Sequence, residues 1–270
     1  MFGIIFQYYN YKKHLKFNIV MKRSLKELSG YKVQAIDQQD GKVIDFLFDD
    51  ESWVVRYVEI DFGNFFINER VIIPGVFFDK IDYKEKLFNI NLKLETIKNG
   101  PKPETKMPVS RKYEEALNKY YAQNPYWPVS TYYPPAHPKE YYPPRPLKVP
   151  AKIISENINT NLRSFQEVNG YIIQAIDDKI GHIEDIIIDD ADRQIVYLVI
   201  DTSNWMPLSK KLLIAVEWLS EISYLDQEAQ INLLSKTIKE APEFNYDSPI
   251  QTEYEIQLYN FYNDVFKNKL

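Results

Sequence analysis

Two clusters of carboxylates are the residues whose types and spacing best suit chemistry in this sequence. Carboxylate oxygens are ligands that hard cations such as Ca²⁺ prefer, but neither cluster has the full EF-hand spacing with its later glutamate. Aspartate also favours turns, because its side chain bonds to nearby backbone N–H groups. We therefore expect hairpin tips and keep a cation site as the alternative. The clusters comprise Asp49, Asp50 and Glu51, and Asp189, Asp190 and Asp192.

Other reactive residue types occur in unsuitable contexts. The histidines, His14, His137 and His182, lack the spacing of metal ligands or of a catalytic triad, and His182 is expected to be a solvated turn residue. The sequence has no cysteine, which excludes disulfides, thiolate metal sites and cysteine nucleophiles. No GxSxG motif or glycine-rich phosphate loop occurs. We expect no catalytic residue and no cofactor, and therefore no enzyme.

Length and charge limit the class of protein further. A chain of 270 residues, of which 45% are hydrophobic, favours two domains with real cores. The net charge is −5, and because residues 1–23 hold basic residues but no acid, the rest is more acidic still. Such a body repels the phosphates of duplex nucleic acid. No run approaches the ~18 apolar residues that span a bilayer, so we expect no transmembrane segment and a cytoplasmic location.

Residues 1–23 form a basic N-terminal extension with three open interpretations. It is a flexible extension, or an amphipathic stretch that gives peripheral membrane association, or an upstream artefact, since Met21 is a natural start directly before the first recurring segment. Its apolar residues precede its lysines, which is not the order of a signal peptide.

The elements that position these residues are present twice. The stretch SGYKVQAID at Ser29–Asp37 recurs as NGYIIQAID at Asn169–Asp177, and residues 24–61 align with residues 164–201 without a gap. The match continues through TIKNGP and TIKEAP to tyrosine-rich segments that close each copy. A repeat of about 98 residues is a duplicated domain and not a solenoid period. We expect each copy to have its own core.

The periodicity within each copy is that of short strands. Alternating segments such as YKVQAID and strand-rich segments such as KVIDFLFDD predict five or six strands in each copy. Asp40–Gly41 and Ile180–Gly181 are predicted to be tight hairpin turns, and the acid clusters second hairpin tips. Short antiparallel strands without intervening helices predict a small barrel, which we expect to be closed because closure removes edges.

The end of each copy changes to a helical period. Apolar side chains recur there at steps of three and four, which predicts a structural helix with one apolar face. In the second copy Ser248, Pro249 and Gln251 form a capping-box pattern that predicts the helix start. The two apolar sets are Val109, Tyr113, Leu117, Tyr120 and Tyr121, and Ile250, Tyr254, Leu258, Phe261 and Tyr262.

Residues 101–163 hold the first of these helices, at about residues 109–122, and a linker rich in proline and tyrosine. Most of the 16 prolines of the chain lie in residues 101–150, which predicts an extended, semi-rigid segment. Its aromatic residues pack over the first barrel and between the copies, or form an exposed recognition strip, or stack on single-stranded nucleic acid. The candidate interaction residues are Tyr126, Trp127, Tyr132, Tyr133, Tyr141 and Tyr142.

Both copies resemble the PRC-barrel family. The resemblance rests on the opening Ser-x-x-Glu-x-x-Gly, the strand and glycine turn, DFLFDD, and a tyrosine-containing third strand that ends in aspartate. This family includes the cytoplasmic domain of the photosynthetic reaction-centre H subunit and the C-terminal domain of a ribosome maturation factor. The resemblance implies a bacterial protein that uses its barrels as docking or scaffolding surfaces. The copies depart from each other in the loops Phe62–Arg70 and Thr202–Lys211, which either set partner choice or have drifted.

Taken together, the predicted fold is mainly β, with two tandem small antiparallel β-barrels, each followed by an α-helix, that pack on each other. The expected domains are residues 1–23 (extension), 24–100 (first barrel), 101–163 (helix and linker), 164–242 (second barrel) and 243–270 (C-terminal helix). The expected function is non-catalytic protein interaction or scaffolding with an unidentified protein partner. The alternative is a sensor that binds a small ligand or a cation through the acidic hairpin residues.

Overall fold

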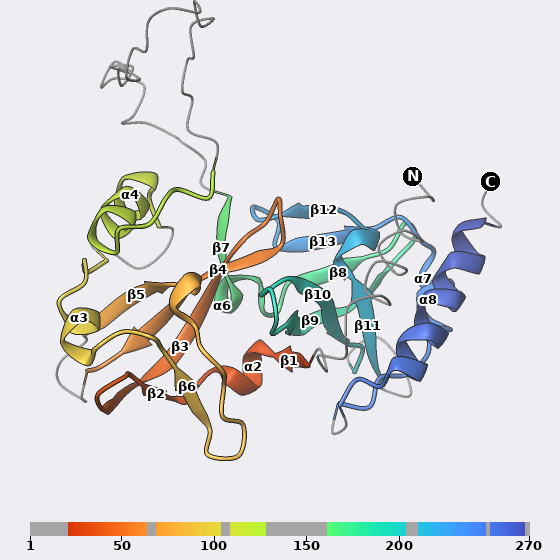
Figure 1. Cartoon of the computed structure of the whole chain (residues 1–270). Coiled ribbons are helices and arrows are strands. Elements are labelled where there is room, and N and C mark those ends of the chain that lie inside the picture. Colours follow the sequence, from red (N-terminus) through yellow and green to blue (C-terminus); the bar gives the residue numbers. More distant parts are fainter. Residues whose placement is uncertain are drawn as a thin grey trace, which may run out of the picture.

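Two sheets dominate the computed structural model, one from each copy of the repeat, and they lie side by side (Figure 1). This arrangement confirms the expected mainly β fold built from two tandem units. The structure describes residues 21–63, 69–103, 109–127, 161–203, 210–246 and 249–267.

The first sheet has the strand order β5-β4-β3-β2-β6. Its strands are β2 (Lys32–Gln34), β3 (Gln39–Asp49), β4 (Val54–Asp61), β5 (Arg70–Pro74) and β6 (Leu87–Asn89), with the 3-10 helix η1 (Gly75–Phe77) after β5. The helices of this copy are α3 (Leu94–Lys98) and α4 (Arg111–Tyr120).

The second sheet repeats this plan with the order β11-β10-β9-β8-β13-β12. Its strands are β8 (Ile172–Gln174), β9 (Lys179–Asp189), β10 (Ile195–Asp201), β11 (Lys211–Ala215), β12 (Leu219–Ser223) and β13 (Glu228–Ile231), with η2 (Val216–Trp218) between β11 and β12. The helices α7 (Ser235–Lys239) and α8 (Thr252–Lys267) follow.

Each copy begins with a short strand and a single helical turn. These elements are β1 (Lys22–Ser24) and α2 (Leu25–Leu28) in the first copy, and β7 (Leu162–Ser164) and α6 (Phe165–Val168) in the second. Lys22 and Arg23 therefore belong to a strand, which corrects the predicted boundary of the N-terminal extension at residue 23. Residues 1–20 lie outside the described residues.

Hydrogen bonds between strands do not close either sheet into a full barrel among the described residues. The second sheet runs from β11 at one end to β12 at the other, and η2 joins these two strands directly. The two end strands of this sheet are therefore connected by the backbone of η2 and not by hydrogen bonds between strands. One pair in each sheet, β2 with β6 and β8 with β13, is parallel, whereas the sequence predicts antiparallel strands throughout.

The two glycines that were expected in hairpin turns lie inside strands instead. The turn comes earlier, where the Ala35 N–H donates to the carbonyl of Gln38 at 3.0 Å, so Gly41 falls in β3 with a positive φ of 75° that favours glycine. Gly181 falls in β9, where a Cβ would collide with the carbonyl oxygen of Asp201. His182 is accordingly a strand residue opposite Asp201 and not a turn residue.

The helices at the ends of the copies lie where the helical period places them, with two differences. Tyr120 is exposed, although the period assigns it to the apolar face of α4. Helix α8 begins at Thr252, so Pro249 and Gln251 precede it, and Ser248 lies outside the described residues. No helix in the described ranges is both long and apolar enough to cross a membrane.

Buried side chains fill both faces of the central strands. Phe46, Leu47 and Phe48 are consecutive in β3 and all are buried, as are Ile186, Ile187 and Ile188 in β9. Because successive side chains of a strand point to opposite faces, each of these strands is covered on both sides. Part of that cover comes from the other copy.

Candidate functional site at the junction of the two sheets

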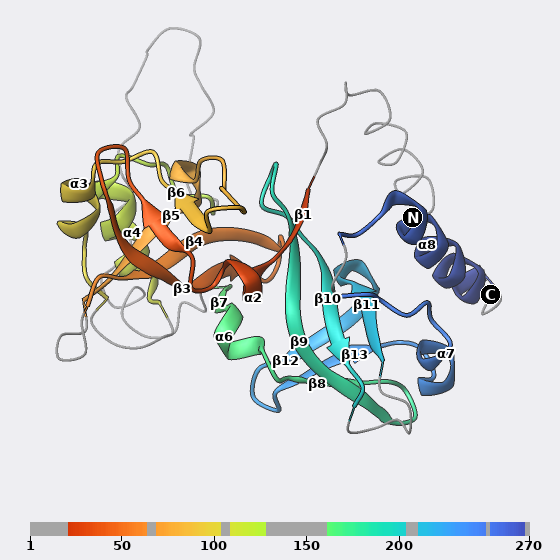
Figure 2. The same cartoon turned by 90° about the horizontal axis from the view of Figure 1, so that it is seen from below.

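The two copies exchange their first elements. Strand β1 pairs with β9 of the second sheet, where Arg23 lies opposite Ile188, and β7 pairs with β3 of the first sheet, where Arg163 lies opposite Phe48. The helical turns that come after these strands are exchanged with them, because α2 packs on β9 and α6 packs on β3. Figure 2 shows β1 and α2 lying along β9, with β7 and α6 beneath β3. Each sheet is thus completed by a segment of the other copy.

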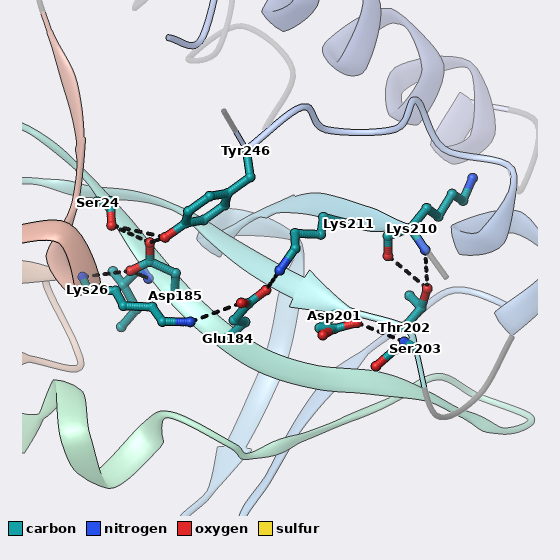
Figure 3. A network of polar contacts seen from close by, with 11 residues as sticks. Ser24, Lys26, Glu184, Asp185, Asp201, Thr202, Ser203, Lys210, Lys211 and Tyr246 are labelled. Carbon is teal, nitrogen blue, oxygen red and sulfur yellow. Dashed lines mark hydrogen bonds and ion pairs between the residues drawn. The ribbon is translucent and has the colours of Figure 1, made fainter. Parts of the chain in front are cut away.

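A buried aspartate holds each exchanged segment. Asp185 accepts hydrogen bonds from the hydroxyl of Ser24, from the Lys26 backbone N–H at 2.9 Å and from the Tyr246 hydroxyl at 2.5 Å (Figure 3). Its own neighbour adds the Ile186 N–H at 2.7 Å. Burial raises the pKa of Asp185 despite these donors, because a charged carboxylate is costly to remove from water.

Asp45 has the same role for the other segment. It accepts from the hydroxyl of Ser164, from the Gln166 N–H at 3.1 Å and from the Phe46 N–H at 2.8 Å. Burial raises the pKa of Asp45 to about 6, although the bonds from Ser164, Gln166 and Phe46 favour the charged form. Ser164 also caps α6, where its side chain forms a capping box with Glu167.

Next to Asp185, an ion-pair cluster ties the first copy to the second sheet. Glu184 accepts from Lys26 Nζ at 2.9 Å and from Lys211 Nζ (Figure 3). Burial opposes ionisation of Glu184, but the bonds from the two lysines outweigh it and hold the pKa below its usual value. Only Lys26 comes from the first copy, so this bond adds a charged contact to the exchange.

The predicted acid clusters lie at hairpin tips beside the exchanged strands. Asp50 Oδ2 pairs with Arg163 Nε at 3.0 Å, and Asp190 Oδ2 pairs with Arg23 Nε at 3.6 Å. Each arginine also lies over a tyrosine ring, Arg163 at 3.8 Å from the centroid of Tyr224 and Arg23 at 3.4 Å from that of Tyr83. These carboxylates therefore bind the chain's own cations.

Glu51 accepts from Asn161 Nδ2 at 2.9 Å, and the other aspartates of these clusters stabilise the turns. Asp49 accepts from the Ser52 N–H at 2.6 Å, Asp189 from the Ala191 N–H at 3.0 Å, and Asp192 from the Gln194 N–H at 3.0 Å, the turn role expected for aspartate. Across the described ranges, no three His, Asp or Glu side chains are placed to hold a metal ion together.

The two hairpin tips also pair with each other. Val54 forms an isolated antiparallel bridge with Gln194. The Val55 N–H donates to Arg193 O at 3.0 Å, and the Ile195 N–H donates to Trp53 O at 2.7 Å. The two bonds are reciprocal, because Val55 is equivalent to Ile195 and Trp53 to Arg193. The copies are therefore related by a pseudo-twofold.

The serine–aspartate pairs at this junction lack the surroundings of a serine nucleophile. Ser24 and Asp185 are hydrogen-bonded, yet a serine nucleophile needs a base such as histidine and an open site, and Asp185 is fully buried. The same holds for Ser164 and Asp45, both of which are buried.

Tyr126 and Trp127, which the sequence proposes as interaction residues, pack on the first copy. The Tyr126 hydroxyl donates to Glu114 Oε1 at 3.0 Å, and the guanidinium of Arg56 lies 4.3 Å from the centroid of the Tyr126 ring. The guanidinium of Arg111 lies 4.0 Å from the Trp127 ring centroid. The other four proposed residues, Tyr132, Tyr133, Tyr141 and Tyr142, lie outside the described residues, as do His14 and His137.

Glu114 is a buried residue that the sequence reasoning missed. Tyr57 of β4 donates to it at 3.2 Å, and Arg111 pairs with it at 3.0 Å. Its equivalent, Glu255, accepts from Tyr197 of β10 and from Lys22 of β1, both at 2.7 Å. The signal was present, because this Glu recurs on both helices and the Tyr recurs on both third strands.

Both copies present an isoleucine to solvent at the same position. Ile36 is 61% exposed and Ile176 is 59% exposed. Their backbones are held in place: the Ile36 N–H donates to Leu92 O at 3.0 Å, and the Ile176 N–H donates to Leu233 O at 3.0 Å. Leu234, which follows Leu233, is 45% exposed. The equivalent residue of the first copy is Lys93, so the surface around Ile176 is more apolar than the surface around Ile36.

Comparison with known proteins agrees with this internal symmetry. The family model described as PRC-barrel domain matches twice, over residues 22–94 and over residues 162–236, which is more than half of the chain. Both matches begin at the exchanged strands β1 and β7, and both stop before the helices α4 and α8. No curated protein matches the chain.

Proposed function

We propose that this chain, which belongs to the PRC-barrel family, is a scaffold that docks a protein partner on the outer surface of its interlocked sheets. PRC-barrel domains are in general non-catalytic and often mediate protein interactions, and the buried hydroxyl and carboxylate pairs at the junction agree with that role. The cytoplasmic location and the bacterial setting expected from the sequence belong to this proposal.

The observation that carries the proposal is the pair of exposed isoleucines, Ile36 and Ile176. A single exposed apolar side chain is ordinary, but here the same large residue is exposed to the same degree in both copies. Each is followed by an aspartate whose carboxylate anchors the turn: Asp37 accepts from the Leu94 N–H at 2.9 Å and Asp177 from the Ser235 N–H at 2.7 Å. The side chains therefore project from preorganised turns, which lowers the entropy cost of binding.

The second copy has the stronger docking surface, because Ile176 and Leu234 are both exposed there. Burying an exposed isoleucine or leucine against a partner contributes roughly 1.5–3 kcal/mol each. We therefore expect the partner to contact Ile176.

The test places a photo-crosslinking amino acid at position 176 in the native host and, separately, at position 76. Val76 is a matched control, since it is 56% exposed and lies in η1 of the first copy. We expect one defined protein to crosslink at position 176 but not at position 76, and Ile176→Glu to weaken that purified complex at least tenfold. Val76→Glu should leave it unchanged. Equal crosslinking at both positions, or a complex that tolerates Ile176→Glu, would refute the docking surface.

A further inference from the structure

A cleft of about 270 Å³ lies where the tip of the first hairpin meets the second copy. Asp50 and Trp53 line one side, and Val216, Glu221 and Tyr224 lie among the residues of the other side. Its lining has two aromatic rings and two carboxylates, groups that recognise cations through ring faces and ion pairs. Arg163 already contacts Asp50 and the Tyr224 ring, so the Trp53 ring and Glu221 are the groups left for another cation.

The pseudo-twofold partner of this cleft shows what such a place holds. Its equivalent residues are Asp190, Arg193, Gly75 and Tyr83, and there the chain fills the space with its own arginine. Arg193 Nη1 donates to Gly75 O at 2.8 Å. Its Cδ and Nε atoms lie so near Gly75 that a Cβ on this glycine would be 3.2 Å from each of them. In this half of the molecule a guanidinium is thus seated between the copies.

Two substitutions between the copies leave the cleft open and change its charge. Trp53 stands at the position of Arg193, and its ring stacks on Phe48, with the centroids 5.6 Å apart and an interplanar angle of 13°, so it supplies no cation. Glu221 stands at the position of Lys80 and is exposed. At these two positions the counterpart therefore has Arg193 and Lys80, whereas the cleft has Trp53 and Glu221.

We propose that this cleft binds an arginine side chain of a partner protein. Asp50 is already paired with Arg163, so Glu221 supplies the charge and the Trp53 ring supplies a flat surface. A planar guanidinium can use both at once, which a lysine ammonium does less well. The proposal rests on the proposed function only in that the arginine belongs to a protein.

The test titrates the whole protein with N-acetylarginine amide and, in parallel, with the neutral isostere N-acetylcitrulline amide. Binding is followed by the ¹H–¹⁵N resonances of the Glu221 backbone amide and of the Trp53 indole. We expect saturable shifts with the arginine compound and several-fold weaker binding of the citrulline compound. Glu221→Gln should weaken arginine binding by roughly three- to tenfold, whereas Glu115→Gln, an exposed control on α4, should have no effect.

A second variant fills the cleft and leaves the charge of Glu221 unchanged. Trp53→Arg gives the cleft the residue found in its counterpart, and we expect it to abolish binding at the Glu221 amide. Equal binding of the two compounds, no binding of either, or unchanged arginine affinity in Glu221→Gln would overturn the proposal. Because the probe needs no partner, such a failure would leave the docking surface at Ile176 untouched.

Discussion

At the scale of single residues, the two buried aspartates at the junction hold the exchanged segments in place. Asp45 and Asp185 each accept a serine hydroxyl and a backbone N–H from the opposite copy. Removing a partner from such a group leaves buried acceptors unsatisfied, which costs about 1–3 kcal/mol. Replacing either serine by alanine should therefore destabilise the protein by about this amount.

The raised pKa of Asp45 predicts a pH dependence. Burial raises this pKa from 3.8 to about 6, so the folded chain binds the proton more tightly than the unfolded chain does. The resulting stability is fully present below about pH 4 and is lost as the pH rises through about 6, by up to about 3 kcal/mol. Asp185, whose pKa is also raised, contributes in the same direction.

Asp45→Asn should make the free energy of unfolding depend less steeply on pH. An asparagine Oδ1 can accept both backbone N–H groups, and its Nδ2 can donate to Ser164, so the site keeps its bonds without the charge. We expect the free energy of unfolding in urea to fall less between pH 4 and pH 7 in the variant than in the native protein. Asp79→Asn, at an exposed position, is the control. A slope in Asp45→Asn equal to the native one would show that Asp45 does not titrate in this window.

At the scale of elements, the strands and the end helices follow from periodicity, but their partners do not. Alternation predicts β2, residue types that favour strands predict β3 and β4, and steps of three and four predict α4. Nothing in periodicity could say that β1 would pair with β9 and not with β3. Ser24 and Ser164 are the same residue in the same context, and so are Asp45 and Asp185, so either serine suits either aspartate. Chain connectivity and packing decide between them.

Other errors of sequence reasoning have local physical causes. Gly41 suggests a turn, yet the same residue also permits the positive φ of a bulged strand. The proline and glutamine near residue 250 resemble a helix start, but α8 begins only at Thr252. The cleft beside Trp53 could not be predicted at all, because it depends on which residue of each copy meets the other across the pseudo-twofold.

Because of the exchange, α2 should stabilise the sheet of the second copy and not that of its own copy. Leu25 is fully buried in α2, and α2 packs on β9 of the other copy. Leu25→Ala should cost ~2–5 kcal/mol and should speed hydrogen exchange first in the amides of β9. Leu94→Ala is the control, because α3 packs on β5 of its own sheet, and it should act on the first sheet. Faster exchange in β3 but not in β9 after Leu25→Ala would argue against the exchange.

At the scale of the whole molecule, the two PRC-barrel copies form one interlocked body. Paired hairpin tips, the two arginine–aspartate ion pairs and two exchanged segments hold the copies in a fixed relation. A fixed relation is what a scaffold requires, because it sets the positions of Ile36 and Ile176 relative to each other and keeps the cleft beside Trp53 formed.

Disulfide trapping can detect the exchanged arrangement without interference, since the chain has no cysteine of its own. Lys22 lies opposite Asp189 across β1 and β9, in a pair flanked by the bond from Asp190 N–H to Met21 O. Such a pair brings the Cα atoms to about 4.5 Å, close enough for a disulfide. The double variant Lys22→Cys with Asp189→Cys should therefore form an intramolecular disulfide on mild oxidation. In the matched variant, Lys22→Cys with Asp49→Cys, both thiols should stay free. The reverse pattern, with position 22 trapped on position 49, would contradict the exchanged arrangement.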